Sequence, residues 1–207
     1  MLKAERHIVF PDGCRDLLVV REPDGTCEVT LTEFDFHPRP AALRPGTDIS
    51  GYRLRPGADV SRPVVEAIAA NPDLAETILG GECGDWNDLD EAIAALTMPG
   101  ATVAAVARSL GVSIRTMQRH FLSRNLPPPD FWRLLARARQ AARLLSDAAP
   151  LAEVADECGF SDQAHMTRDF TRWFGLTPAQ LRGNASLLKI LGQPALGNWT
   201  GEQISTR

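Results

Sequence analysis

The sequence has few cysteines and no long apolar run, and both shortages narrow the class of protein. Its 207 residues include four cysteines, at positions 14, 27, 83 and 158. None forms a Cys-x-x-Cys pair, so the zinc-knuckle pattern is missing, and four are sparse for a disulfide scaffold. No run of about 18 apolar residues suggests a membrane-spanning helix, and MLKAERHIVF does not resemble a secretory signal. We therefore expect buried thiols in a reducing cytoplasm.

The composition is that of a globular protein, but the charge is unevenly distributed. Apolar residues make up 44% and charged residues 23% of the chain, whose length allows one large domain or two small ones. Residues 1–100 contain 18 acidic and 9 basic residues, whereas residues 101–182 contain 7 acidic residues and 11 arginines. An acidic half joined to an arginine-rich half indicates that only the second half faces a polyanion.

The first third has the pattern of short β-strands. The segments HIVF (7–10), DLLVV (16–20) and CEVTLTEFDF (27–36) are separated by two Pro-Asp-Gly turns. Residues 38–63 are expected to form loops with one short strand near 52–54. Helical periodicity begins after Pro63, and two short helices are expected, over VVEAIAAN (64–71) and DLAETILGG (73–81).

These patterns predict an α+β protein with its domain boundary near residues 80–88. The expected parts are a small β-containing domain over 1–85, an all-α domain over 86–182 and a tail over 183–207. Asn87 or Asp88 is expected to cap the first helix of the second domain. The tail has one apolar run, 187–191, which predicts either a short helix docked on the N-terminal domain or on a partner subunit, or a frayed end.

An internal repeat in the second half is the most informative feature. Its first copy is Val103-x-x-Val106-Ala107-x-x-Leu110-Gly111-Val112-Ser113. Its second copy, 48 residues further on, is Leu151-x-x-Val154-Ala155-x-x-Cys158-Gly159-Phe160-Ser161. The apolar spacing forms one stripe on a short helix, the glycine ends that helix, and the serine caps the next. This order predicts two helix-turn-helix units.

Each copy continues into a second helix with its own apolar positions. Met117 and Phe121 in the first copy correspond to Met166 and Phe170 in the second, now 49 residues apart. The second copy therefore has one extra residue where its helix begins. One helix over about 129–145 joins the copies and has a length of roughly 26 Å. It can hold the two units about one DNA turn apart, ~34 Å between centres.

Residues 89–182 resemble the AraC/XylS-type transcriptional regulators. The most specific part is Val154-Ala155-x-x-Cys158-Gly159-Phe160-Ser161-Asp162-Gln163, followed by Phe170 and by Trp173-Phe174-Gly175-Leu176-Thr177-Pro178. The resemblance implies a double helix-turn-helix domain that binds double-stranded DNA. Leu126 replaces a glycine common in the family, so Asn125 is expected to adopt the left-handed conformation. Leu122 and Thr171 replace common lysines, which removes two expected phosphate contacts.

The outward residues near the start of each second helix are the expected base readers. Arginine pairs with guanine and glutamine with adenine in bidentate fashion, and alanine can pack on a thymine methyl group. The predicted DNA-binding residues are Arg115, Gln118, Arg119, Gln163, Ala164, Thr167 and Arg168. Because Ala164 stands where the family often has a polar side chain, the second helix is expected to discriminate less. Solvated or phosphate-paired side chains are the alternative for each arginine.

Four other arginines are expected to contact phosphate or to brace the two units: Arg137, Arg139, Arg143 and Arg172. Phosphate contacts fix the register of a protein on DNA without recognising its sequence. His120 and His165 lack partners at metal-ligand spacing and are expected to pack or face phosphate. Trp132 and Trp173 are expected in the core rather than stacked on bases.

Two segments of the first third resemble a motif pair of a subset of AraC-like regulators. The segments are Pro11-Asp12-Gly13-x-x-Asp16-Leu17 and Gly51-Tyr52-Arg53-Leu54-Arg55-Pro56-Gly57-Ala58. A small-molecule pocket lined by Asp12, Asp16, Arg53 and Arg55 is one interpretation, and internal ion pairs with two ordinary turns are the other. No metal site or cofactor is expected, because the His-x-His spacing of a metal-binding barrel is missing.

The leading hypothesis is a cytoplasmic, non-enzymatic transcription factor that binds specific double-stranded DNA. Its other expected partner is a small-molecule effector or RNA polymerase; a homodimer is left open, and no membrane contact is expected. One alternative is a DNA-binding module fused to an alkyl-acceptor enzyme with Cys14 as its reactive thiol. Another is a ligand- or protein-binding module with a degenerate helix-turn-helix pair.

Overall fold

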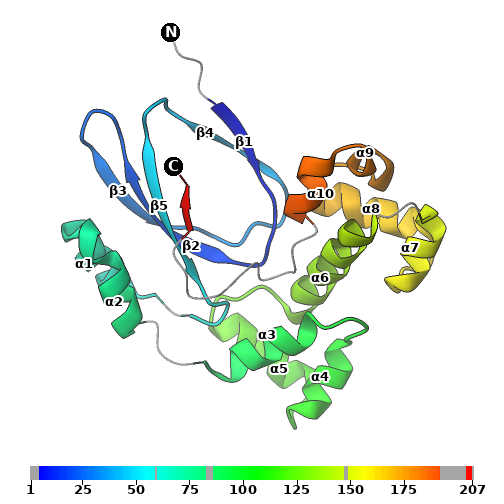
Figure 1. Ribbon diagram of the computed structural model, residues 1–207. Coiled ribbons are helices and arrows are strands. Elements are labelled where there is room, and N and C mark those ends of the chain that lie inside the picture. Colours follow the sequence, from blue (N-terminus) through cyan, green and yellow to red (C-terminus); the bar gives the residue numbers. More distant parts are fainter. Residues whose placement is uncertain (1–4, 59, 83–85, 147–148, 192–203, 207) are drawn as a thin grey trace.

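The computed structural model describes residues 5–58, 60–82, 86–146, 149–191 and 204–206, and places a β-rich part beside a helical part (Figure 1). The β-rich part contains strands β1 (Glu5–Val9), β2 (Arg15–Arg21), β3 (Cys27–Leu31), β4 (Arg39–Leu43) and β5 (Asp48–Leu54). β1 pairs with β4, and a second sheet has the order β3-β2-β5-β6, with β6 spanning Ile204–Thr206. All the pairs are antiparallel.

The prediction of loops over residues 38–63 was wrong for β4 and most of β5. Pro40 lies opposite Ile8 in the β1–β4 pair. A proline is tolerated there because this ribbon has only two strands, so one side of β4 needs no donor. Gly51 lies opposite Leu18 in the larger sheet, although glycine lowers strand propensity. Pairing with β2 therefore outweighs the local Pro and Gly signals.

Two helices cover the larger sheet and close a small core. They are α1 (Arg62–Ala70) and α2 (Ala75–Glu82), joined by the 3-10 turn η1 (Pro72–Leu74). Leu17 and Val19 of β2, Ile68 of α1 and Ala75 of α2 are fully buried in this core. The predicted helices over 64–71 and 73–81 are thus confirmed to within one or two residues.

The helical part contains eight helices among the described residues. They are α3 (Asp88–Leu96), α4 (Val103–Ser109), α5 (Ile114–Ser123), α6 (Pro129–Leu144), α7 (Leu151–Glu157), α8 (Gln163–Phe174), α9 (Pro178–Arg182) and α10 (Ala185–Leu191). Asn87, one of the two residues predicted as the cap, caps α3 through a capping box. Figure 1 shows α6 between the group formed by α3, α4 and α5 and the group formed by α7 to α10.

The predicted repeat is confirmed at the level of the backbone. Gly111 and Gly159 have φ values of 68° and 70°, and Asn125 has φ 53°. These are left-handed conformations, which glycine adopts without cost and asparagine tolerates. Ser113 caps α5, but the prediction that Ser161 caps the corresponding helix was wrong, because the cap of α8 is Asp162. The extra residue of the second copy moves the helix start by one position.

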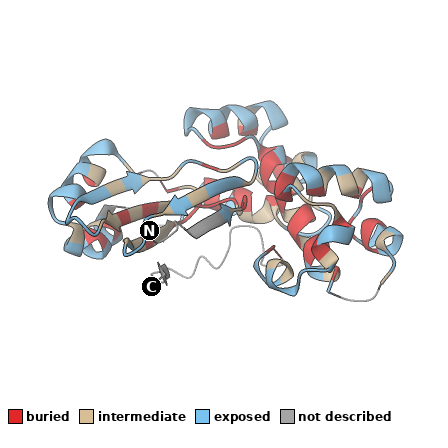
Figure 2. Ribbon diagram, turned by 90° about the horizontal axis from the view of Figure 1, so that it is seen from above, coloured by how far each residue is buried: buried red, intermediate tan, exposed pale blue. Residues whose placement is uncertain are grey.

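The core of the helical part extends into the β-rich part. Phe10 and Phe34 belong to the same buried cluster as Phe121, Trp132 and Phe170. The buried segments are densest in the helical half (Figure 2). The two parts of the chain therefore share apolar packing instead of meeting only through a linker.

The tail folds back on the helical part. Helix α10 packs against α6 and α9, and Leu191 is buried. A docked helix was one of the two predictions for this region, but its partner is α6. Trp199 lies outside the described residues. No helix among the described residues is both long and apolar enough to cross a membrane.

Candidate nucleic-acid interface

Helix α5 is held by its cap and by one buried side. The Ser113 hydroxyl accepts a hydrogen bond from the Thr116 amide at 3.0 Å. Met117 and Phe121 are buried on the inner side. On the other side the three predicted readers are exposed, and among the described residues no hydrogen bond or ion pair is formed by their side chains: Arg115, Gln118 and Arg119. This side of α5 is therefore available to an external partner.

Helix α8 is held in the same way, with a different cap. The Asp162 carboxylate accepts a hydrogen bond from the His165 amide at 2.6 Å, and this bond lowers the pKa of Asp162. Met166, Phe170 and Trp173 are buried. The exposed predicted readers are Gln163, Ala164 and Arg168.

Thr167 differs from the other predicted readers of α8. It is half-buried, and its hydroxyl donates to the Gln163 carbonyl at 2.9 Å. The donor is thus used within the helix, and only the oxygen lone pair and the methyl group remain for an external partner.

Helix α6 connects the two units through a buried side. Its 16 residues span about 24 Å. Trp132 is fully buried, and its indole N–H donates to the Pro127 carbonyl at 3.2 Å. Trp132 and Trp173 are thus core residues, as predicted. The indole bond fixes the proline-rich turn between α5 and α6.

Arg137 is one of the four arginines predicted to contact phosphate or to brace the two units. Its contacts are internal and hold the units together. Its guanidinium forms an ion pair with Asp169 of α8 at 2.7 Å and lies 4.3 Å above the Phe160 ring. Arg143 and Arg172 are exposed, and Arg172 lies over the Trp173 ring at 4.8 Å. Arg137 therefore links the connecting helix to the second unit. No sequence pattern pointed to its partner Asp169, which lies 32 residues further on.

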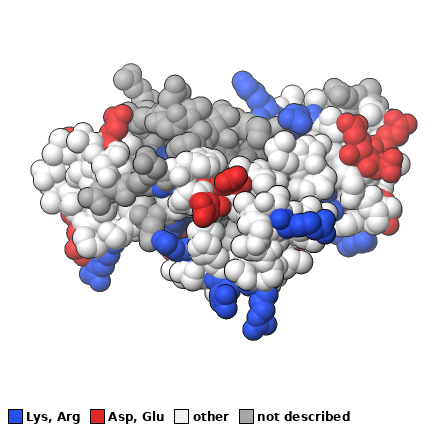
Figure 3. Space-filling model, turned by 90° about the horizontal axis from the view of Figure 1, so that it is seen from below, with Lys and Arg blue, Asp and Glu red and all other residues white. Residues whose placement is uncertain are grey.

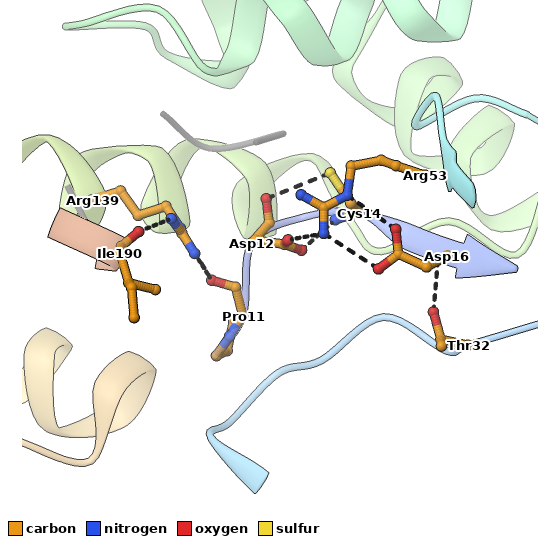
Figure 4. Close-up of polar contacts among 8 residues, drawn as sticks. All are labelled: Pro11, Asp12, Cys14, Asp16, Thr32, Arg53, Arg139 and Ile190. Atoms are coloured by element: carbon orange, nitrogen blue, oxygen red, sulfur yellow. Dashed lines mark hydrogen bonds and ion pairs between the residues drawn. The ribbon is translucent and has the colours of Figure 1, made fainter. Parts of the chain in front are cut away.

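Arg139 does not lie on the outer side of α6, where the sequence pattern placed it. It is 3% exposed, and its guanidinium donates to the Pro11 carbonyl at 2.9 Å and to the Ile190 carbonyl at 3.4 Å. Burial leaves it no surface for a phosphate. Instead, it joins α6 to the β-rich part and to α10 (Figure 4).

Three of the four residues predicted to line an effector pocket come together as an ion-pair cluster. Arg53 of β5 lies between two carboxylates, with Asp12 at 2.8 Å and Asp16 at 3.0 Å (Figure 4). Burial raises the pKa of Asp12, although the charge of Arg53 opposes the rise. These contacts match the second interpretation of the motif pair, internal ion pairing.

The fourth residue, Arg55, does not join this cluster. It is 7% exposed and forms an ion pair with Asp90 of α3, which is fully buried. Asp90 also accepts hydrogen bonds from the Gly57 amide at 2.7 Å and the Asn87 amide at 3.1 Å. The contacts of Arg55 therefore also match internal ion pairing, with a partner outside the motif pair. Only the spacing Asn87-x-x-Asp90, a capping-box pattern, pointed toward Asp90 in the sequence.

Cys14, the candidate alkyl acceptor, is in an unreactive setting. Its side chain is 6% exposed, and burial together with Asp12 raises the pKa of the thiol far above its usual range. A reactive cysteine needs an accessible thiolate. These observations disfavour the alkyl-acceptor alternative.

We expect iodoacetamide to modify Cys27 of the native protein at least about a hundredfold faster than Cys14, since only an accessible thiolate reacts. Cys27 is exposed, whereas Cys14 is buried. Peptide mass spectrometry over a time course measures both rates, and the same reaction in urea is the control in which the difference disappears. Equal rates in the folded protein would contradict the buried position of Cys14.

The charged side chains of the lower face are grouped rather than evenly mixed. In the view from below, Lys and Arg side chains project at several separate places, and acidic side chains form a large group at one edge with smaller groups near the centre and on the opposite side (Figure 3). Glu153, Asp156 and Glu157 of α7 are exposed acidic residues of the second unit. The face is therefore not a uniform cation surface, and specific contacts have to carry any preference for DNA.

Comparisons with known proteins identify the helical region. A family model described as a helix-turn-helix domain matches residues 106–184. Residues 106–184 are an AraC-type helix-turn-helix domain. The sequence resemblance to this type is thereby confirmed over residues 106–182, a range that includes both α5 and α8.

The relatives of the AraC-type domain are named as transcriptional regulators. The HTH-type transcriptional regulator VirS of Mycobacterium tuberculosis is 35% identical over 78 residues, which are 38% of this chain and 23% of VirS. The HTH-type transcriptional regulator RipA of Corynebacterium glutamicum is 39% identical over 69 residues, which are 33% of this chain and 21% of RipA. The chain thus spans less than a quarter of the length of each of these two relatives.

One solved structure with similarity to this chain is an AraC-type transcriptional regulator from Chromobacterium violaceum. It is 23% identical, and the match covers 55% of this chain and 92% of that one, with a TM-score of 0.39. A similarity at this level supports no conclusion by itself.

Proposed function

We propose that the chain is a sequence-specific transcription factor that inserts α5 and α8 into successive major grooves of double-stranded DNA. One observation carries the proposal: each helix buries its apolar side and exposes arginine and glutamine side chains near its start. Arg115, Gln118 and Arg119 do so on α5, and Gln163 and Arg168 on α8. These are the side-chain types that form bidentate pairs with guanine and adenine.

The remaining parts of the chain have supporting roles in this proposal. Helix α6 spaces the two units, and the exposed Arg143 and Arg172 supply phosphate contacts, which set register. The β-rich part carries the regulation, through a small-molecule effector or a contact with RNA polymerase. Its packing against α3 and α6 provides a physical route from such a partner to the helices that meet DNA.

Selection of bound duplexes from a random pool tests the proposal. We expect one enriched sequence with two half-sites, and binding that weakens steeply with salt. The Arg119→Ala variant should lose about 1–3 kcal/mol and accept other bases at one position of the first half-site. The matched control is Arg62→Ala, which removes an exposed arginine on α1. Equal affinity of the wild type for selected and random duplexes would favour a degenerate helix-turn-helix pair and reject the proposal.

A further inference from the structure

The β-rich part contacts the first helix-turn-helix unit through α3. The Gly57 amide and the Arg55 guanidinium both donate to the Asp90 carboxylate. The approach is close, because a Cβ atom on Gly57 would lie 2.8 Å from Asp90 Oδ1 and 3.1 Å from Asn87 Oδ1. Real Cβ atoms essentially never approach to 2.8 Å, so any larger residue at position 57 would displace the Asp90 carboxylate. Helix α3 in turn packs against both α4 and α6.

The same part of the chain contacts the connecting helix α6. The Phe34 ring meets the Trp132 ring edge-on at 5.4 Å, and the Phe36 ring lies 4.9 Å from that of Phe131. The Arg139 guanidinium binds the Pro11 carbonyl from the buried side of α6. Apolar packing and a charged hydrogen bond therefore hold α6 against the β-rich part.

The contact continues to the second unit. His37 Nδ1 donates to the Arg172 carbonyl of α8 at 3.2 Å. Pro38 lies beside the end of α8, where a Cβ atom on Gly175 would be 3.6 Å from Pro38 Cγ. Residues 34–38 thus reach from α6 to α8 within five residues, while Gly57 holds α3 on the other side.

We propose that the β-rich part is a splint that fixes the spacing and rotation of the two helix-turn-helix units and so sets which half-site spacing the protein accepts. This inference rests on the proposed DNA-binding function. Inserting one base pair moves a half-site by about 3.4 Å and rotates it by roughly 35°. Without the splint, the two units are joined by α6 alone and can adjust to such a change. With the splint, the contacts of the β-rich part with α3, α6 and α8 oppose the adjustment.

The splint does not cover the surface that meets DNA. The predicted readers Arg115, Arg119 and Arg168 stay exposed while Phe34, Asp90 and Arg139 are buried. The arrangement held by the splint is therefore the one that binds DNA. Because this arrangement is stiff, it favours duplexes in which the two half-sites have the matching spacing.

Duplexes that keep both selected half-sites but add or remove one base pair between them test the splint. We expect the wild type to lose about tenfold or more in affinity for each altered duplex, because one of two linked binding events is strained. In Gly57→Ala the added methyl group forces Asp90 away from Gly57, and the loss should shrink at least about threefold. Gly80→Ala is the matched control, since a Cβ atom there meets nothing within 4 Å. His37→Ala, at an exposed residue, gives a second and milder test at the other end.

A measurement without DNA keeps the splint testable if the DNA-binding proposal fails. Spin labels at Leu122→Cys and Thr171→Cys, both at exposed positions of α5 and α8, report the distance between the units. Cys27→Ser and Cys83→Ser remove competing thiols. A narrow distance distribution that broadens in Gly57→Ala and not in Gly80→Ala supports the splint. Equally narrow distributions in all three, or an unchanged spacing penalty in both Gly57→Ala and His37→Ala, overturn it.

Discussion

Replacing Asp90 with alanine lowers the free energy of unfolding by about 3–5 kcal/mol, the range for removing one partner of a buried ion pair. Asp90 is fully buried and accepts hydrogen bonds from Arg55, Gly57 and Asn87. Its loss leaves the Arg55 charge without this carboxylate in the interior and removes half of the capping box of α3. Urea denaturation followed by circular dichroism measures the change.

Two controls separate the buried pair from a general effect of losing a carboxylate. Asp73→Ala removes the partner of Arg21 at a side chain that is 94% exposed, so stability should change by less than about 1 kcal/mol. The double variant Arg55→Met and Asp90→Leu removes both charges and should recover only the part of the loss that comes from the Arg55 charge, because leucine accepts no hydrogen bond from the Gly57 and Asn87 amides. A loss below about 1 kcal/mol in Asp90→Ala would mean that water reaches this carboxylate and screens it.

The helix-turn-helix units were predictable because their signals are local. A stripe of apolar residues, a glycine and a cap lie within about eleven residues of each other. Together they define one helix, the turn that ends it and the start of the next helix. The left-handed Asn125 followed from Leu126 replacing a glycine, and φ 53° confirms it. The cap of α8 was misplaced because serine and aspartate are equally good caps, and only the backbone decides between Ser161 and Asp162.

The buried arginines were not predictable because their partners are distant in sequence. Arg55 finds its carboxylate 35 residues further on, and Arg139 finds the Pro11 carbonyl 128 residues back. In a helix of mixed composition, the sequence around an arginine is the same whether its side chain faces solvent or packs against another part of the chain. Strand β4 and the first part of β5 were missed for a related reason, since their stability comes from pairing with β1 and β2 and not from their own propensity.

Removing the outward glutamine and arginine from α5 should weaken binding to the selected duplex far more than the same change on α8. The variant Gln118→Ala, Arg119→Ala is expected to lose about 2–6 kcal/mol, from about 1–3 kcal/mol for each bidentate pair. The matched variant Gln163→Ala, Arg168→Ala should lose at least about tenfold less affinity, since a 1.4 kcal/mol difference is tenfold. Fluorescence anisotropy at constant salt measures both.

The difference between the helices follows from what each one offers to bases. Helix α5 has three free polar side chains, whereas α8 has Ala164 at one reading position and a Thr167 hydroxyl already bonded to its own helix. A salt titration shows which kind of contact was lost, since each lost phosphate contact lowers the slope of log K against log salt by about 0.9. A loss on α5 with an unchanged slope therefore identifies base recognition. Equal losses of affinity on both helices, or a larger loss on α8, would contradict the unequal roles of the two helices. A lower slope of log K against log salt, with an unchanged sequence preference, would assign Arg119 to a phosphate contact.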